Sequence, residues 1–295
     1  MMSAGFQMKR FYVRHDRSSM LVGTDGVLLG AWCPLRSDER GLLRSDERGK
    51  LRSDERGKAE RDMAGRVFRV LDAGTGCGLI ALMIAQRIEE SIGGRDEDGK
   101  DAGSRDEDGK DEGGTRLQAC GYGDWQVDGI DIDAASVGQA AENFALSSWG
   151  GRLRACCSDV REWEGTYDLI VTNPPFYNNA LVSPYQRRAQ ARQAGLTLSF
   201  EELARSAVRL LSPSGLLGVI VPAREESAMV GCAAHNGLYM HSRCVVCSKP
   251  GGMPKRVLMV FGRGSRPMRE TSLVLYDAAG SRSEDYARLT ERFYL

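Results

Sequence analysis

Four consecutive residues, Asn173-Pro174-Pro175-Phe176, combine groups that could present a planar nitrogen for reaction. Two prolines fix the main chain and remove two N–H donors, which leaves carbonyl groups free to accept hydrogen bonds. The Asn173 side chain offers an acceptor, and Phe176 offers a flat face for stacking. We therefore expect Asn173 and the Pro174 carbonyl to accept the two N–H bonds of an exocyclic amine. The alternative is a rigid turn that ends a strand, with Phe176 as core filler.

A glycine-rich turn, Asp72-Ala73-Gly74-Thr75-Gly76-Cys77-Gly78, closes an apolar run and opens a helical pattern. Glycines permit positive backbone angles and close approach of a ligand to the main chain. A nucleotide-like ligand would bind at the carboxyl ends of the strands and the amino end of the helix. The GxGxG spacing disfavours the GxGxxG turn of a nicotinamide-dependent oxidoreductase. An acidic group at Asp72 could hold the cationic amino-acid end of S-adenosylmethionine.

Two further aspartates end predicted strands, Asp131 followed by Ile132 and Asp159 followed by Val160. A carboxylate at the first of these tips can accept both hydroxyls of a ribose. A side chain at the second can reach an adenine amino group. Either aspartate alone would more often be a helix cap or a solvated loop residue. Their recurrence at successive strand ends predicts one cleft for S-adenosylmethionine, beside an amine whose proton can leave after the methyl group arrives.

These residues need a sheet to bring them together. Short apolar runs alternate with helical patterns, which predicts a doubly wound α/β fold with a mostly parallel, seven-stranded sheet and an antiparallel edge hairpin. Ser199 and Glu202 form a capping box before one helix, and Asp133 caps another. Strands are predicted at 66–74, 125–133, 152–159, 167–173, 216–222, 242–247 and 255–263, helices at 78–90, 134–145, from 199 and at 225–237, and a tail strand at 271–277 before a short helix.

Two polar repeats interrupt this pattern. The unit LRSDERG occurs three times between Leu35 and Lys58, and RDEDGKD occurs twice between Arg95 and Gly113. Neither has an apolar face that could offset its ordering entropy, so both are expected to be solvated insertions. Each precedes a strand and should therefore lie at the amino ends of the strands, opposite the cleft.

Composition and motifs argue against a membrane protein, a secreted protein and a metal-binding protein. The 295 residues are 42% hydrophobic and 27% charged with a formal net charge of +0. No apolar run is long enough for a membrane helix and the start lacks the pattern of a signal peptide, so a cytoplasmic protein without membrane contact is expected. The only CxxC, Cys244 to Cys247, has no second pair, and no metal site is expected. Outside the repeats the chain is mildly basic, which is compatible with a nucleic-acid substrate.

Together these motifs resemble the amino-methylating branch of class I S-adenosylmethionine-dependent methyltransferases. More narrowly, the chain resembles the bacterial family that methylates N6 of adenine 37 in tRNA1(Val), with its NPPF motif. The runs that carry the likeness are FYVRHD, MLVGTDGVLLGAW, LDAGTGCGLIALMIAQR, DIDAASVGQAAENF, YDLIVTNPPFY and RAQAR. It spans nearly the whole chain except the repeats. Asp131 departs from it, where a glutamate is common, as does Cys77 inside the glycine turn.

The resemblance implies a tRNA partner, met at its anticodon region, and implies roles for particular residues. The catalytic group would be Asn173, Pro174, Pro175 and Phe176. The cofactor residues would be Thr24, Asp25, Asp72, Gly74, Gly76, Gly78, Asp131, Ile132, Asp159, Val160 and Asn173. The substrate residues would be Phe176, Tyr177, Arg187, Arg188 and Arg192, although arginines on a helix are more often merely solvated.

The resemblance also implies a division of the chain. Residues 1–34 would be a cofactor-covering segment, 35–64 a repeat insertion, 65–263 the methyltransferase domain with a second insertion at 92–115, and 264–295 a strand and helix extension. Two alternatives stay open. A protein glutamine N5-methyltransferase of the release-factor type would use the same Asn-Pro-Pro pocket, and an inactive RNA-binding module would bind tRNA without the cofactor.

Overall fold

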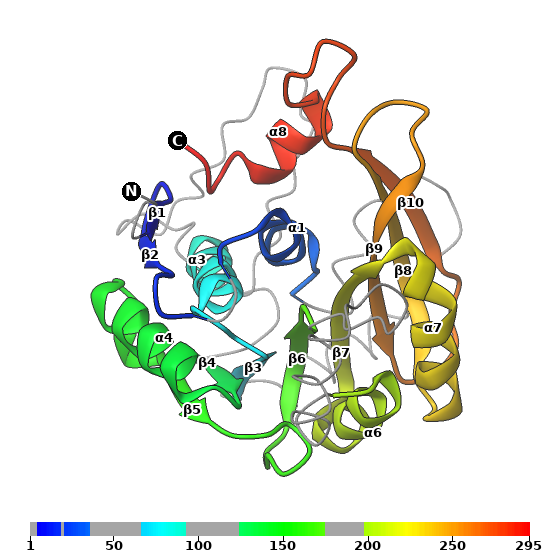
Figure 1. Ribbon diagram of the computed structural model, residues 1–295. Coiled ribbons are helices and arrows are strands. Elements are labelled where there is room, and N and C mark those ends of the chain that lie inside the picture. The colour runs from blue at the N-terminus through cyan, green and yellow to red at the C-terminus, as the bar shows by residue number, and fades with distance from the viewer. Residues whose placement is uncertain (1–4, 19–20, 36–65, 93–123, 175–197) are drawn as a thin grey trace, which may run out of the picture.

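An eight-stranded sheet forms the centre of the molecule (Figure 1), with strands in the order β10-β8-β9-β7-β6-β3-β4-β5. The computed structural model describes residues 5–18, 21–35, 66–92, 124–174 and 198–295. The strands are β3 (Val67–Ala73), β4 (Asp124–Asp131), β5 (Leu153–Cys157), β6 (Tyr167–Thr172), β7 (Leu211–Pro222), β8 (Tyr239–Cys247), β9 (Pro254–Gly262) and β10 (Arg269–Val274). A separate antiparallel hairpin joins β1 (Gly5–Gln7) to β2 (Tyr12–Arg14).

The predicted α/β class is confirmed, and two details of the sheet differ from the expectation. The five strands β3 to β7 are mutually parallel, and β9 runs antiparallel between β7 and β8. The tail strand joins the sheet as β10, parallel to β8, so that the sheet has eight strands instead of seven. The β8–β9 hairpin is consequently not at the edge, because β10 covers the backbone groups that β8 would otherwise expose.

Helices cover both faces of the sheet, as a buried parallel sheet requires. Alternate residues of each strand join different apolar clusters: Val70 packs on one face of β3 and Leu71 on the other. In Figure 1 the first face carries α1 (Thr24–Trp32), α3 (Leu79–Ile92), α4 (Ala134–Leu146) and α8 (Glu284–Thr290), and the second carries α6 (Phe200–Leu210) and α7 (Glu226–His235). Short 3₁₀ helices lie at Gly150–Arg152 and Ala223–Glu225.

Local signals begin two of these helices as predicted. The Asp133 carboxylate accepts the backbone N–H groups of Ala135 and Ser136 at the start of α4. Ser199 and Glu202 form the complete capping box of α6, each side chain bonded to the other residue's backbone N–H. These caps satisfy donors that the first turn of a helix leaves unpaired, which explains why they could be found in the sequence.

Helix α1 is an element that the sequence patterns did not predict. Its five buried residues, Gly26 to Gly30, are consecutive and show no helical period. A Cβ atom on Gly30 would lie 2.9 Å from the Met83 sulfur of α3, so glycine is what lets the two helices approach this closely. The Arg87 guanidinium then donates to the carbonyls of Gly30 and Cys33 at 2.8 and 2.7 Å and holds the end of α1.

Apart from Leu35, the repeats lie outside the described residues, and their predicted solvation stays a prediction. Their junctions are described: Arg66 directly precedes β3, and Asp124 begins β4. Both junctions are at the amino ends of parallel strands. Leu35, which starts the first repeat unit, is 2% exposed and belongs to the core. Across the described part of the chain, no helix is long and apolar enough to cross a membrane.

Candidate active site

The glycine turn and the Asn173 corner lie side by side at the carboxyl ends of the neighbouring strands β3 and β6. The chain turns from β3 to β4 on one side and returns to β6 on the other, and ligands of open α/β sheets bind at such a reversal. Asp72 pairs with Val171 of β6, so two residues further along Asn173 is level with Gly74. Neighbouring strands are about 4.8 Å apart. Asn173 is half-buried and Pro174 is buried, which places this corner against the fold.

The three glycines of the turn have positive φ angles of 76° at Gly74, 54° at Gly76 and 84° at Gly78. Residues other than glycine rarely adopt this conformation, because their Cβ atom clashes with the backbone, and this explains the GxGxG spacing. Gly78 is further constrained, since a Cβ there would lie 2.5 Å from the Phe144 ring of α4. A Cβ on Gly74 would meet no atom within 4 Å. The turn is therefore closed on its α4 side and open at Gly74, where a ligand can approach the main chain.

Asp72 is fully buried beneath this turn. Its Oδ2 accepts the Thr75 hydroxyl at 2.7 Å and the Ala81 N–H at 3.1 Å, which ties the end of β3 to the start of α3. Its Oδ1 has no hydrogen-bond partner among the described residues. Burial raises the pKa of Asp72 to about 7. One carboxylate oxygen thus braces the turn, and the other is an acceptor that suits a cationic donor such as an ammonium group.

Asp131 lies directly across the turn. Its Oδ2 accepts the Gly76 N–H and its Oδ1 accepts the Asp133 N–H, both at 3.0 Å. A carboxylate oxygen has two lone pairs, so each oxygen can still accept one hydroxyl of a ribose. Ile132 beside it is 44% exposed and offers an apolar surface at the edge of the sheet.

Asp159 follows β5 and is held by an arginine that the sequence analysis missed. The Arg161 Nε donates to both carboxylate oxygens at 3.0 Å, and Arg161 Nη1 reaches Glu202 Oε1 at 2.9 Å. This contact holds the pKa of Asp159 below its usual range. Val160 is buried beside it. The Ser158 N–H donates to the Asp131 carbonyl at 3.0 Å, so Asp159 and Asp131 belong to the same rim.

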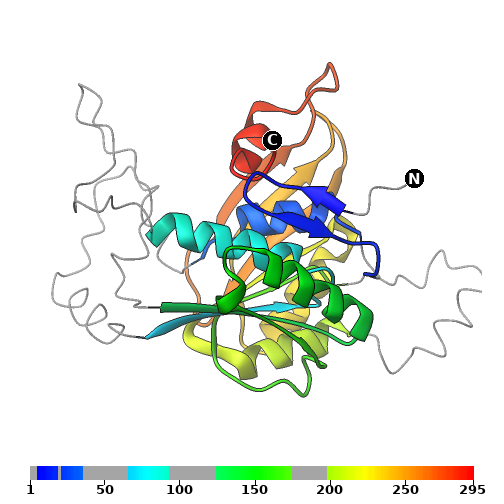
Figure 2. The same cartoon turned by 90° about the vertical axis from the view of Figure 1, so that its left-hand side faces the viewer.

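The amino-terminal segment runs beside α4 (Figure 2). Two side chains of this helix dock it next to the glycine turn. Gln139 accepts the N–H groups of Arg17 and Ser18 at 3.1 and 2.8 Å. Asn143 accepts the Arg14 N–H and donates to the Cys77 carbonyl of the turn at 2.8 Å. Both side chains are buried. The sequence analysis missed them as well, although two polar residues four apart on the apolar face of a helix are a recognisable signal.

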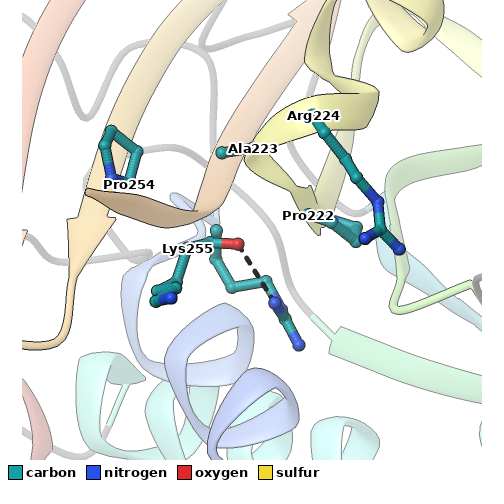
Figure 3. A pocket seen from close by; sticks show the side chains of 6 residues that line it. Pro222, Ala223, Arg224, Pro254 and Lys255 are labelled. Atoms are coloured by element: carbon teal, nitrogen blue, oxygen red, sulfur yellow. Dashed lines mark hydrogen bonds between the residues drawn. The ribbon is translucent and has the colours of Figure 1, made fainter.

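Asp25 forms an ion pair with Arg256 of β9, at the same end of the sheet. Its Oδ2 accepts Arg256 Nε at 2.7 Å, whereas Thr24 next to it is exposed. Arg256 lies at the start of β9, opposite Pro222 at the end of β7, and therefore two strands beyond β6. A cavity of about 440 Å³ opens here (Figure 3), lined by Pro222, Ala223, Arg224, Pro254, Lys255 and Arg256.

Several residues expected in the site lie outside the described residues, namely Pro175, Phe176, Tyr177, Arg187, Arg188 and Arg192. The structure thus brings together the glycine turn, Asp72, Asp131, Asp159 and Asn173. The two cysteines of the CxxC are on β8, where Cys244 is buried and Cys247 is half-buried. In the described ranges there is no group of three or more His, Cys, Asp or Glu side chains that could hold a metal ion.

Comparison with known proteins shows full-length relatives. A tRNA1(Val) (adenine(37)-N6)-methyltransferase of Bacteroides fragilis (strain YCH46) is 34% identical, covering 98% of this chain and 97% of that protein. One of Enterobacter sp. (strain 638) is 31% identical, covering 99% and 95%. A crystal structure of a predicted O-methyltransferase from Agrobacterium tumefaciens, 15% identical, matches with a TM-score of 0.53 over 92% of this chain and 98% of that chain, and shares the fold. No protein-family model matches the chain.

Proposed function

Because the chain belongs to the tRNA1(Val) (adenine(37)-N6)-methyltransferase family, we propose that it transfers the methyl group of S-adenosylmethionine to N6 of an adenine in tRNA. The target would be position 37 of a valine tRNA, reached through the anticodon region. One observation of the structure carries this proposal: the pairing of β3 with β6 sets the Asn173 corner level with the glycine turn. An amine held at the corner would lie beside a cofactor held at the turn.

The residues of the turn and the strand ends fit the cofactor. Asp72 has an acceptor with no partner among the described residues for the amino-acid end, and Gly74 leaves the main chain open beside it. Asp131 would accept the ribose hydroxyls, and Asp159 would accept the adenine amino group. Gly76, Gly78, Ile132 and Val160 would shape the same crevice, with Thr24, Asp25 and Asn173 at its border. S-adenosylmethionine supplies a methyl group made electrophilic by its sulfonium.

At the corner, the Asn173 side-chain oxygen and the Pro174 carbonyl would accept the two N6–H bonds of the target adenine. These hydrogen bonds would draw the nitrogen lone pair out of conjugation with the ring and direct it toward the methyl group that the cofactor supplies. The transfer would form a nitrogen–carbon bond as the carbon–sulfur bond breaks, and the amine proton would then leave to solvent. Much of the acceleration would be positional, an effect that reaches about 7–11 kcal/mol in well-oriented reactions.

The remaining residues of the site would act on the RNA. Phe176 would stack on the adenine after the base is turned out of its stack, which costs a few kcal/mol. Pro175 would keep the corner rigid, and Tyr177 would border the base. Arg187, Arg188 and Arg192 would contact RNA phosphates, which position an RNA without reading its sequence.

The division of the chain belongs to the same proposal. Residues 1–34 would cover the cofactor, 65–263 would carry the reaction and 264–295 would extend the fold, with 35–64 and 92–115 as insertions. The docking of Arg14 and Ser18 on α4 beside the turn supports the first of these assignments. We place the reaction in the cytoplasm because its tRNA substrate is found there.

Nucleoside analysis tests the proposed function. The chain is incubated with valine tRNA and methyl-labelled S-adenosylmethionine, the tRNA is digested, and label is expected in N6-methyladenosine. The matched control is a valine tRNA with guanosine at position 37, which should remain unlabelled. Label in a glutamine of a release factor instead of in tRNA would contradict the proposal. Binding of tRNA without binding of labelled cofactor would contradict it too, and would indicate an inactive RNA-binding module.

A further inference from the structure

The cavity between β7 and β9 has features that the methyl-transfer site does not use. We will call it the basic pocket, defined by Pro222, Ala223, Arg224, Pro254, Lys255 and Arg256. Figure 3 shows Arg224 and Lys255 on opposite sides of it, one from the segment after β7 and the other from β9. Pro222 and Pro254 fix the main chain on these two sides. The pocket is thus a rigid opening with cationic walls.

The charges of the pocket favour an anion. Arg256 is neutralised by Asp25 at 2.7 Å, and Arg224 lies 3.4 Å from the Glu225 carboxylate. Arg224 is nevertheless 63% exposed, so its guanidinium remains open to solvent. Lys255 is exposed and its ammonium has no carboxylate partner in the described part of the chain. Three cations face two carboxylates, and this excess of positive charge is unsuited to the sulfonium of the proposed cofactor.

The place of the pocket relates it to the reaction corner. Asp159 follows β5, Asp131 ends β4, Gly74 follows β3 and Asn173 follows β6, so these residues succeed one another at the carboxyl ends of neighbouring strands. Pro222 at the end of β7 and Arg256 near the start of β9 come next in this order. Val219 of β7 is level with Thr172, so Pro222 lies two residues further along its strand than the level of Asn173. Arg256 of β9 lies two strand spacings, roughly 10 Å, across the sheet from β6. A polyanion whose base occupied the corner would pass its backbone over this edge.

We propose that the basic pocket binds a backbone phosphate of the tRNA next to the target adenosine, with Lys255 and Arg224 as the phosphate-binding residues. This inference rests on the proposed function. Arg256 acts differently: its bond to Asp25 fixes the first turn of α1 against β9, so it positions the pocket wall. Phosphate contacts of this kind set the register of a nucleic acid on a protein, and they leave the choice of base to the corner.

The test measures binding of valine tRNA to the full chain without cofactor, over a range of salt concentrations. The double variant Lys255→Ala, Arg224→Ala should weaken binding by about tenfold for each lost charged contact. The slope of log affinity against log salt should fall by about 0.7 for each phosphate released. The KM for tRNA should rise while kcat and cofactor affinity stay unchanged. Lys255→Arg should keep wild-type binding, because it keeps the charge.

Arg288→Ala serves as the matched control, because it removes another exposed arginine, paired with Asp285 on α8, and should leave tRNA binding unchanged. An unchanged salt slope in a folded double variant would overturn the proposal. So would loss of inorganic phosphate binding without any change in tRNA binding, which would indicate a site for a small anion. Competition by polyglutamate as strong as by tRNA would indicate an acidic protein partner instead.

Failure of this inference is distinguishable from failure of the proposed function. If the wild-type chain methylates tRNA and the double variant binds it equally well, only the pocket is wrongly assigned. If the wild-type chain transfers no methyl group but its tRNA binding depends on Lys255 and Arg224, the pocket assignment stands and the reaction is wrong.

Discussion

At the scale of single residues, the site depends on groups whose environment is unusual for their type. Asp72 is a carboxylate with no exposure and one oxygen without a partner among the described residues. Asn173 directly follows a buried strand and is half-buried. Both could be named from the sequence, because a polar residue at the end of an apolar run stands out. Their environments could not, because burial is set by neighbours from other elements.

Replacing Asn173 by alanine should reduce methyl transfer by at least about two orders of magnitude, since loss of a preorganised polar group at a reaction centre has effects of this size. Cofactor affinity, measured by calorimetry, should fall much less. Asn236→Ala, which removes an amide at the end of α7, is the control and should retain full activity. Near-wild-type turnover of Asn173→Ala would refute the role of this side chain.

Asp72 should make the stability of the ligand-free protein depend on pH. Burial raises its pKa in the folded state to about 7 from an ordinary 3.8, so the folded state keeps a proton that the unfolded state has already lost. The stability that this group contributes is fully present below about pH 4 and is lost as the pH rises through 7. By linkage the loss amounts to about 4 kcal/mol at most.

Asp72→Asn tests this pH dependence because an amide cannot ionise. Urea unfolding from pH 5 to 8 should show the variant gaining stability relative to the wild type as the pH rises. Its affinity for the cationic cofactor should fall further below that of the wild type as the pH rises, because only the wild-type carboxyl gains a negative charge. Glu291→Gln, which removes an exposed carboxylate directly after α8, provides the comparison. Parallel stability curves for wild type and Asp72→Asn would show that the buried carboxylate carries no such penalty.

At the scale of elements, α1 determines how the amino-terminal segment meets the sheet. Helix α1 packs on α3 through Gly26 and Gly30. Directly after the helix, Cys33 packs on Gly218 of β7, where a Cβ would lie 2.3 Å from the Cys33 sulfur. The pairing of Asp25 with Arg256 fixes its first turn. The position of this helix depends on three partners that are distant in sequence, and a local pattern does not contain that information.

Gly30→Val should destabilise the protein by about 1–3 kcal/mol, because the added methyl groups overlap Met83 in a packed interface. Gly138→Ala on α4 is the control for a glycine with free space around it, because a Cβ there would meet no atom within 4 Å. That variant should be stabilised by about 0.5–1 kcal/mol through helix propensity alone. Thermal unfolding of the two variants separates the effects, and equal shifts would contradict close packing of α1 on α3.

At the scale of the whole molecule, the residues of the proposed site lie at the carboxyl ends of the parallel strands, and the junctions of the repeats lie at the amino ends. Parallel pairing of β3, β4, β5, β6 and β7 puts all their carboxyl ends on the same side. The residues proposed to hold the cofactor, the Asn173 corner and the basic pocket follow one another along that side. We therefore expect the chain to accept added residues at the amino ends of the strands without loss of the proposed reaction.

Deleting residues 36–58 or 93–113, with a short glycine-serine linker in place of each, should leave turnover within about tenfold of wild type, since long surface insertions contribute little to loop-closure entropy. Leu35 must be kept because it is buried in the core. Steady-state methylation of tRNA checks the outcome. A greater loss in a deletion protein that still unfolds cooperatively would show that a repeat contributes to the site.

The sequence by itself determined the features that depend on neighbouring residues. Strand and helix periods predicted the α/β class, Ser199 with Glu202 and Asp133 predicted helix starts, and the glycine spacing predicted a turn whose φ angles are positive. Such features arise within a few residues of chain. They can therefore be deduced from residue types and their spacing.

Only the tertiary structure decided which distant residues meet. Asp25 pairs with Arg256, Asn143 bridges the amino-terminal segment and the glycine turn, and β10 takes the edge beside β8. These contacts follow from how strands pair and how helices pack over the whole sheet. The basic pocket depends on them as well, because its cations come from separate elements and only the register of β7 and β9 makes them neighbours.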